Sequence, residues 1–376
     1  MGKGTLSTRV RKKVQLEDIK VNVCIYAFDF DFLYLNGHTL LQENLRVRRE
    51  TEFGYIVDCI DIKKQPAFDH PLLKNHKLQR KPSFQKSNNK TSVKNSPSRI
   101  LFELEKDECP KGTVPIRRTT KDDLIRTKST LNNSMLMESL MESEPGLHMA
   151  ELTLIPDSGP YYKISGINSI YNPTVLNNNQ ISASNLWVRN GPIATNNKIV
   201  LGWHKDNFKK TGCINMLCRG FVQVNKGTYL GLRVNRTSIY GGPAREFEFS
   251  ISQDVSTKNW WLMLGNIGFG YYPRELFSNL TSADHVGLGG RTRTAPNAAS
   301  PQMGSGHFPD RDISHSCYYF RNISYHDKSR TNFVPERYET TSFTDNSNCF
   351  GVEYRGFPGN VGYFLQFGGP GGNCGK

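Results

Sequence analysis

Apolar and polar residues alternate along much of the second half of the chain, from His148 onward. In Arg245–Ser252 three apolar residues alternate strictly with Glu246, Glu248 and Ser250, the period of a half-buried β-strand. Short apolar runs between Gly, Asn, Pro and Ser clusters predict further strands at Glu151–Ile155, Tyr161–Ile170, Asn185–Arg189, Lys198–Trp203, Gly220–Val224, Thr228–Arg233, Asn259–Leu264, Ile267–Tyr272, Cys317–His326 and Val361–Phe367. Many short strands with little helix predict an all-β sandwich or barrel.

Helical signals are few. A short helix is predicted from Glu275 to Leu280, because Pro273 precedes it and proline favours the first turn. Another helix start is predicted at Thr120, which is followed by Asp122 and Asp123.

The first half of the chain divides by composition. Residues 1–50 have no clear pattern, residues 51–128 hold two ordered-looking islands, and residues 129–147 form a Ser/Met/Glu-rich linker. Between the islands lies a basic, Ser/Asn-rich linker at 80–100. Residues 148–376 form the predicted β domain.

The charge is positive and uneven. The 376 residues include 48 Lys+Arg and 34 Asp+Glu, a net charge of +14, and residues 62–100 hold ten Lys/Arg against the single acid Asp69. Phe68 and Phe84 are the only Phe, Tyr or Trp residues in this stretch, too few to interleave with the charges, and no nucleic-acid module is recognisable, so we interpret it as a solvated linker and expect no nucleic-acid partner.

Several other classes are excluded. No apolar run is long enough to span a membrane, and no phosphate-binding loop, zinc-ligand pair or cofactor motif occurs, so we expect no membrane span, metal or cofactor. Met1–Lys20 is basic and polar, without the apolar core of a signal peptide. Eight cysteines nevertheless favour a secreted protein, as do five candidate glycosylation sites, Asn89, Asn132, Asn235, Asn279 and Asn322.

A set of motifs resembles one protein family. The islands Asp58–Gln79 and Cys109–Arg126 resemble the activation region of plant neprosin-like proteins, and the C-terminal part resembles the neprosin domain. The matching stretches of that domain are TGCINMLCRGFVQVN (Thr211–Asn225), YGG (Tyr240–Gly242), NWWL (Asn259–Leu262), GYYPRELF (Gly270–Phe277), PQMGSGHFPD (Pro301–Asp310), YFRNI (Tyr319–Ile323), NCF (Asn348–Phe350) and FGGPGGNC (Phe367–Cys374).

The resemblance implies an antiparallel β-sandwich preceded by a small, partly disordered prosegment. It also implies a secreted glutamic endopeptidase that is made as a zymogen and cleaves next to proline at acid pH. Two cleft glutamates would carry the chemistry. Such a pair suits water activation because two close carboxyls hold one proton between them, giving one acid and one base.

Both glutamate positions are substituted in this sequence. The family's I-E-x-G-W motif corresponds to residues 199–203, which places Val200 at the first glutamate. The W-G-G-E motif corresponds to residues 288–291, which places Arg291 at the second. Valine has no exchangeable proton, and arginine stays protonated at any relevant pH. The stretch between Trp203 and Thr211 is also shorter than in the family.

Other candidates for chemistry and disulfides follow. Glu246, Glu248, Glu275, Asp310 and Asp312 are weak replacement carboxylates, and His315 with Cys317 lacks a third group to orient a base. Trp203, Trp260, Trp261 and Tyr272 are candidate cleft residues. We expect disulfides Cys213–Cys218, Cys349–Cys374 and Cys59–Cys109, which leaves Cys24 and Cys317 unassigned.

Three functions are therefore in view. The first is a neprosin-type protein that has lost peptidase activity and still takes a peptide or protein ligand. The second is a working acid prolyl endopeptidase whose catalytic groups lie elsewhere. The third is a binding module for peptides or cell-wall polymers.

Overall fold

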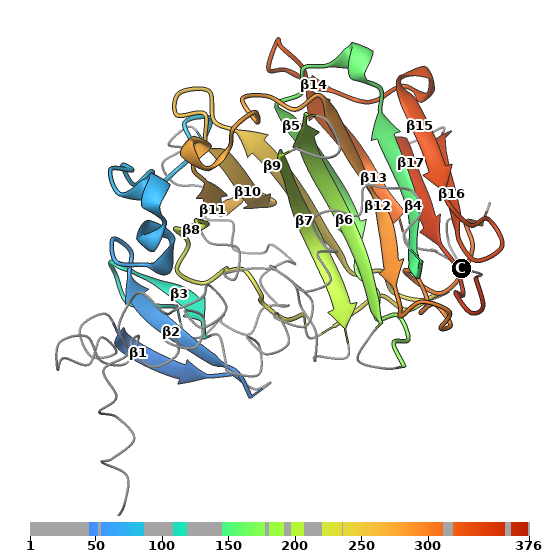
Figure 1. Cartoon of the computed structure of the whole chain (residues 1–376), viewed down its shortest axis with the longest axis horizontal. Coiled ribbons are helices and arrows are strands. Elements are labelled where there is room, and N and C mark those ends of the chain that lie inside the picture. The colour runs from blue at the N-terminus through green and yellow to red at the C-terminus, as the bar shows by residue number, and fades with distance from the viewer. Residues whose placement is uncertain are drawn as a thin grey trace, which may run out of the picture.

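The structure is a computed structural model of the chain. It describes residues 45–51, 54–85, 108–118, 145–176, 180–191, 197–206, 220–234, 236–310, 319–357 and 362–374. Within these residues the fold is built from β-strands and short 3-10 helices, without an α-helix (Figure 1). The all-β prediction is confirmed.

The N-terminal part is a small three-stranded antiparallel sheet. Its strands are β1 (Leu45–Glu50), β2 (Ile56–Asp61) and β3 (Thr113–Arg117), in the order β1-β2-β3. Two 3-10 helices, Pro66–Asp69 and Pro71–Leu73, follow β2. The Cys59–Cys109 disulfide joins β2 to the residues before β3 and confirms that predicted pair.

Residues 147–374 form two antiparallel sheets (Figure 1). The five-stranded sheet has the order β15-β4-β12-β6-β7. Its strands are β4 (Leu147–Leu154), β6 (Ile181–Asn190), β7 (Asn197–Asp206), β12 (His285–Arg293) and β15 (Thr340–Thr344). The nine-stranded sheet has the order β16-β17-β13-β5-β9-β10-β11-β8, with β14 beside β13. Its strands are β5 (Lys163–Ser169), β8 (Val222–Gln223), β9 (Glu246–Gln253), β10 (Trp260–Leu264), β11 (Ile267–Tyr272), β13 (Tyr319–His326), β14 (Asn332–Phe333), β16 (Gly351–Phe357) and β17 (Gly362–Gly368).

The main hydrophobic core lies between these two sheets. The five-stranded sheet contributes Leu152, Leu186 and Leu288, which are fully buried, and the nine-stranded sheet contributes Ile251 and Phe320. This burial is the driving force for the sandwich, because each fully buried side chain of this size stabilises the fold by about 1.5–3 kcal/mol. The predicted antiparallel sandwich is confirmed.

The strand predicted from strict alternation of apolar and polar residues agrees with the structure. β9 buries Phe247, Phe249 and Ile251, as predicted, while Glu248 is exposed. β11 has the predicted bounds. Strand β12 was not predicted, because its sequence HVGLGGRTR is rich in glycine. Its Gly290 is needed for packing, since a Cβ there would lie 2.6 Å from Phe367.

Two predicted elements are wrong. Thr228–Arg233 is not a strand, because the Asn225 side chain accepts hydrogen bonds from the backbone N–H groups of Gly227 and Thr228, both at 2.8 Å, and so folds a turn. The helix expected over Glu275–Leu280 is a single 3-10 turn, Arg274–Leu276. Downstream of that turn, Asn197 of β7 holds the Asn279 backbone N–H at 3.0 Å. The helix start expected at Thr120 lies outside the described residues.

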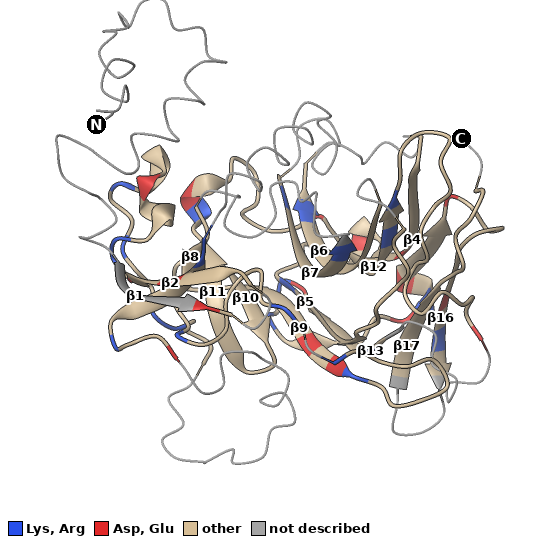
Figure 2. Cartoon of the chain, turned by 90° about the horizontal axis from the view of Figure 1, so that it is seen from below, with Lys and Arg blue, Asp and Glu red and all other residues tan. Residues whose placement is uncertain are grey.

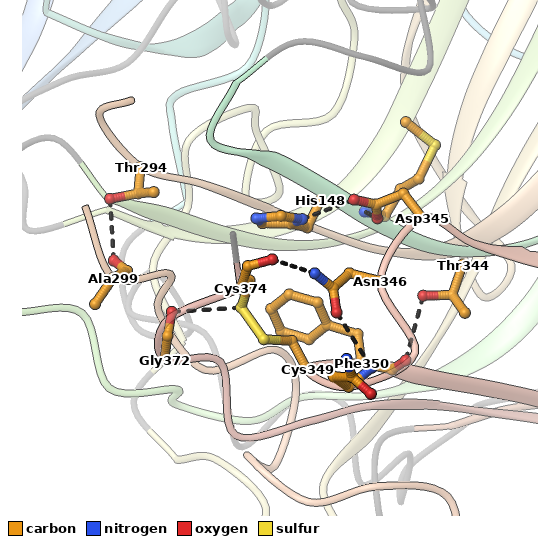
Figure 3. The surroundings of a disulfide bond; sticks show 12 residues. His148, Thr294, Ala299, Thr344, Asp345, Asn346, Cys349, Phe350, Gly372 and Cys374 are labelled. Atoms are coloured by element: carbon orange, nitrogen blue, oxygen red, sulfur yellow. Dashed lines mark hydrogen bonds and ion pairs between the residues drawn. A yellow bond between two sulfur atoms is a disulfide. The ribbon is translucent and has the colours of Figure 1, made fainter. Parts of the chain in front are cut away.

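The C-terminal end of the sandwich is closed by a second disulfide, Cys349–Cys374, which confirms that prediction (Figure 3). Around it the Asn346 side chain donates to the Cys374 carbonyl, and His148 contacts Asp345 with 2.7 Å between nitrogen and oxygen. Cys24, Cys213, Cys218 and Cys317 lie outside the described residues, so the Cys213–Cys218 pair stays a prediction.

Candidate functional site

The candidate site lies on the face of the five-stranded sheet that points away from the core. Strand register places Arg291 of β12 on this outer face, next to Glu151 of β4. The neighbouring strands β6 and β7 add Trp187, Arg189 and Lys198. We call these five residues the outer-face cluster. Figure 2 shows the two main sheets as separate layers, with basic residues on β6, β7 and β12.

Glu151 and Arg291 form a buried ion pair. The Arg291 Nε donates to one oxygen of the Glu151 carboxylate, and its Nη2 donates to the other at 3.0 Å. The Glu151 side chain is only 7% exposed, and the Arg291 side chain is 19% exposed. This two-point contact is the strongest geometry available to arginine and a carboxylate, and it occupies both oxygens of Glu151.

Lys198 and Arg189 are cross-strand neighbours, and both lie close to the Trp187 ring. The Lys198 amine is 4.4 Å from the ring centroid, and the Arg189 guanidinium carbon is 5.7 Å from it. Trp187 is buried, and a Cβ on Gly287 would lie 2.5 Å from its ring. The absence of a side chain at Gly287 therefore lets the indole lie flat against β12.

Burial and neighbouring charges shift the pKa values of Glu151, Lys198 and Arg291. Burial alone would raise the pKa of Glu151, but Arg291 outweighs it and holds this pKa below its usual value. Burial, together with the Arg291 charge, lowers the pKa of Lys198 well below that of a free lysine. Burial acts to lower the pKa of Arg291, but Glu151 outweighs that effect and raises it. Glu151 is thus held as an anion.

Small residues lie between Val200 and Arg291. Asn185 of β6 pairs with Gly202 of β7 and with Gly289 of β12. A Cβ on Gly202 would meet the Ser184 carbonyl oxygen at 2.0 Å, and one on Gly289 would meet the Ala150 carbonyl oxygen at 2.3 Å. Neither position accepts a side chain, so Asn185 has a glycine as its neighbour on each adjacent strand of the outer face.

Val200 and Arg291 share the outer face but are not direct neighbours. Val200 pairs with Trp187, whereas Arg291 pairs with Ala183 on the same strand β6, four residues away. From ordinary strand spacing and rise, their Cα atoms are about 16 Å apart. Val200 is 47% exposed. Two glutamates at these positions would point onto one surface from opposite sides of Asn185.

The aromatic residues expected along a cleft lie elsewhere. Trp203 packs against the core between the sheets, and Trp260 is fully buried there, donating to the Leu280 carbonyl at 2.9 Å. Tyr272 packs edge-on against Phe221. Trp261 is fully buried in a second cluster under the N-terminal part. Their strand parity sends Trp203 and Trp260 into the core, since hydrophobic burial decides the face.

The replacement carboxylates weighed from the sequence are dispersed. Glu246 is bound to Arg321 on the nine-stranded sheet, with 2.7 Å between oxygen and nitrogen, and Glu248 is exposed on the same strand. Glu275 lies 3.4 Å from His76. Asp310 is half-buried in a loop. Asp312, His315 and Cys317 lie outside the described residues.

Sequence reasoning missed Glu151, Trp187, Arg189 and Lys198. Glu151 and Lys198 each occupy an ordinary polar position in a predicted strand, where solvent exposure is the usual outcome. A signal was present only for Trp187, a tryptophan two residues before an arginine in a strand. Among the candidate glycosylation sites, Asn322 is exposed and Asn279 is half-buried, and Asn89, Asn132 and Asn235 lie outside the described residues.

No cluster of three or more His, Cys, Asp or Glu side chains that could hold a metal ion occurs within the described part of the chain. The same residues contain no helix long and apolar enough to cross a membrane.

Comparison with protein families gives two matches. The family model described as Neprosin matches residues 195–370, and the one described as Neprosin activation peptide matches residues 49–148. Together these ranges span most of the chain and include β2 and β3 of the three-stranded sheet, the strands β7 and β12, and both Val200 and Arg291.

Two curated relatives are similar to this chain over a short segment. DNA ligase 1 of Arabidopsis thaliana is 67% identical over 45 residues, 12% of this chain and 5% of the ligase. DNA ligase 1 of Drosophila melanogaster is 56% identical over 83 residues, 19% of this chain and 11% of the ligase. The chain thus spans about a tenth or less of these relatives, and their activity is not carried over to it.

Proposed function

Because the chain belongs to the neprosin family, we propose that it keeps the family's sandwich and lacks its peptidase chemistry. The family is generally extracellular, and we extend that location to this protein.

One observation carries the proposal, the ion pair between Arg291 and Glu151. Acid-base hydrolysis by two carboxyls needs one that is protonated and one that is ionised, within reach of a shared water. At the two positions that resemble the family's glutamates, this chain has a valine and an arginine. The nearby carboxylate, Glu151, is held ionised by two hydrogen bonds from Arg291, so it has no proton to give, and its lowered pKa makes it a weak base.

The test is a cleavage assay at acid pH. The chain is produced through a secretory route, brought to acid pH and given a proline-rich peptide, with mass detection of the products. We expect no cleavage. The matched variant carries Val200→Glu and Arg291→Glu, which returns a carboxyl to each position. Cleavage after proline by the unmodified chain would refute the proposal, whereas cleavage by the double variant alone would support it strongly.

A second candidate function is binding of an anionic ligand on the outer face. The cluster holds the guanidinium groups of Arg189 and Arg291 and the amine of Lys198 against the anion Glu151. The indole N–H of Trp187 and the Nε–H of Arg189 are buried and have no hydrogen-bond partner among the described residues. Buried donors without acceptors are costly, at about 1–3 kcal/mol each, and an acidic peptide side chain would satisfy them.

The binding candidate is tested with an acidic peptide and its amidated counterpart by calorimetry. We expect the acidic peptide to bind more tightly, and Arg189→Gln to remove the difference. Equal binding of the two peptides would count against an anion site.

A further inference from the structure

The segment that follows the two 3-10 helices of the N-terminal part crosses the sandwich domain at β10 and β11. Here Gln79 makes four side-chain hydrogen bonds to the sandwich. We propose that Asp254, Thr257, Asn259 and Trp261 form a recognition site for a glutamine side chain, which Gln79 occupies in this chain.

The side-chain contacts match both ends of a carboxamide. The Gln79 oxygen accepts from the Thr257 hydroxyl at 2.8 Å, from the Asn259 amide at 2.9 Å and from the Trp261 indole at 3.2 Å. The Gln79 NH2 group donates to the Asp254 carboxylate at 2.9 Å. Three donors therefore face the oxygen and one anion faces the nitrogen, an arrangement that only a carboxamide fully satisfies.

The site is fixed by contacts within the sandwich itself. One oxygen of Asp254 accepts from the backbone N–H groups of Ser256 at 2.9 Å and Thr257 at 3.0 Å. The Asn259 side-chain oxygen accepts from the Arg274 backbone N–H at 3.1 Å, so its NH2 group is turned toward Gln79. The donors and the acceptor are thus oriented without help from the ligand, which lowers the entropy cost of binding.

The site also holds the backbone next to the glutamine. The Gln79 backbone N–H donates to the Tyr271 hydroxyl at 2.9 Å, and the Ser83 backbone N–H donates to the second Asp254 oxygen at 2.5 Å. Asp254, Trp261 and Tyr271 are fully buried. Burial would raise the pKa of Asp254, but the hydrogen bonds from Ser83, Thr257 and Gln79 outweigh it and lower that pKa, so the acceptor is an anion.

The ligand class is a peptide segment with one glutamine. Glutamate in place of the glutamine would bring a second carboxylate to within hydrogen-bond distance of Asp254, in a buried setting where like charges repel strongly. Alanine would leave three donors without an acceptor and would remove the Gln79 hydrogen bond to Asp254, which keeps its backbone donors at Ser83, Ser256 and Thr257. The site lies on the nine-stranded sheet, whereas the outer-face cluster lies on the five-stranded sheet, so this inference does not depend on the proposed function.

The test uses the full chain with a specific protease site placed between residues 118 and 145. Neither described disulfide links the two parts: Cys59–Cys109 lies in the N-terminal part, and Cys349–Cys374 lies in the sandwich. After cleavage, the fraction of N-terminal fragment that stays bound to the sandwich is measured by size-exclusion chromatography at several dilutions, at neutral pH.

We expect Gln79→Glu to weaken retention by about 10- to 100-fold, the range for losing a charged hydrogen bond and burying an unpaired group. The matched control is Gln85→Glu, which adds the same charge six residues along, at a half-buried glutamine whose side chain donates a hydrogen bond to the Asn266 carbonyl. The control is expected to change retention by less than about threefold.

A double-mutant cycle separates recognition from loss of fold. Asp254→Asn alone should weaken retention, and Asp254→Asn combined with Gln79→Glu should retain better than either single variant predicts by addition, because an amide then faces the carboxylate. Additive losses, or equal retention of Gln79→Glu and the unmodified chain, would overturn the proposal.

Recognition of a separate peptide is tested on the cleaved Gln79→Glu chain, from which the N-terminal fragment is expected to dissociate. A labelled synthetic peptide of residues 74–85 should bind, and the same peptide with glutamate at the Gln79 position should bind at least about tenfold more weakly. Equal binding of both peptides, or binding of neither, would refute glutamine recognition.

Discussion

The buried pair of Arg291 and Glu151 predicts a large and pH-dependent loss of stability in Arg291→Met. The variant removes both hydrogen bonds to the carboxylate and leaves Glu151, with a side chain only 7% exposed, without its main counter-charge. Breaking one side of a buried pair usually costs about 3–5 kcal/mol.

Protonation of Glu151 sets an independent upper limit on the stability that Arg291→Met can lose. The variant can avoid a buried anion by protonating Glu151, and at pH 7 that costs about 4 kcal/mol for a carboxyl whose unfolded pKa is about 4.3. Lys198 and Arg189 still favour the anion and reduce the cost. We therefore expect a loss of about 2–4 kcal/mol in the free energy of unfolding at pH 7.

The sign of the pH dependence follows from the two pKa shifts. In the unmodified chain the pKa of Glu151 is lowered, so its contribution is present above the unfolded pKa and is lost as pH falls through the folded one. In Arg291→Met burial raises this pKa, so the folded state binds more protons than the unfolded state, and stability falls as pH rises above about 4. The difference between the two proteins should therefore shrink as pH falls from 7 toward 4.

The assay is urea unfolding followed by tryptophan fluorescence at pH 7, 5.5 and 4. Glu151→Leu with Arg291→Met is the first control and should recover most of the loss, because no charge is left buried. Arg321→Met is the second control. It removes a similar two-point pair, with Glu246, that is 32% and 19% exposed, and it should cost about 1 kcal/mol or less. A loss below about 1 kcal/mol at pH 7, or one that does not change with pH, would refute the reasoning.

Three further predictions follow from the same structure. Lys198→Met should raise the free energy of unfolding by about 1 kcal/mol at pH 7, because burial lowers the pKa of this amine. In the unmodified chain, stability should rise with pH between this lowered pKa and the pKa of a free lysine, and the variant should lose that rise. Urea unfolding of both proteins at pH 7 and 9.5 measures the difference. Gly202→Ala should destabilise by about 3 kcal/mol, since its Cβ would lie 2.0 Å from the Ser184 carbonyl oxygen, and an unchanged melting temperature would contradict that geometry. Cys349→Ser with Cys374→Ser should lower stability by about 3 kcal/mol, because the disulfide spans 25 residues, and calorimetry under oxidising conditions, with reduced native chain as the comparison, measures this.

The sequence by itself determined the class of fold and the family. Strict alternation, as in β9, forces one face into the core, because a shift of one residue would expose every apolar side chain. The family resemblance also predicted the cysteine pairs Cys59–Cys109 and Cys349–Cys374, which the structure contains. The assignment of Val200 and Arg291 to the family's glutamate positions stays a prediction from the same motifs.

Only the tertiary structure decided what surrounds those positions. Glu151 and Arg291 are 140 residues apart, and they meet because β4 and β12 pair in a register that no local pattern encodes. The same holds for Gln79 and Asp254, which are 175 residues apart and join a prosegment to a sheet. Hydrophobic alternation depends on the nearest neighbours in the chain, whereas the charges and donors that face one another depend on which strands are adjacent in space.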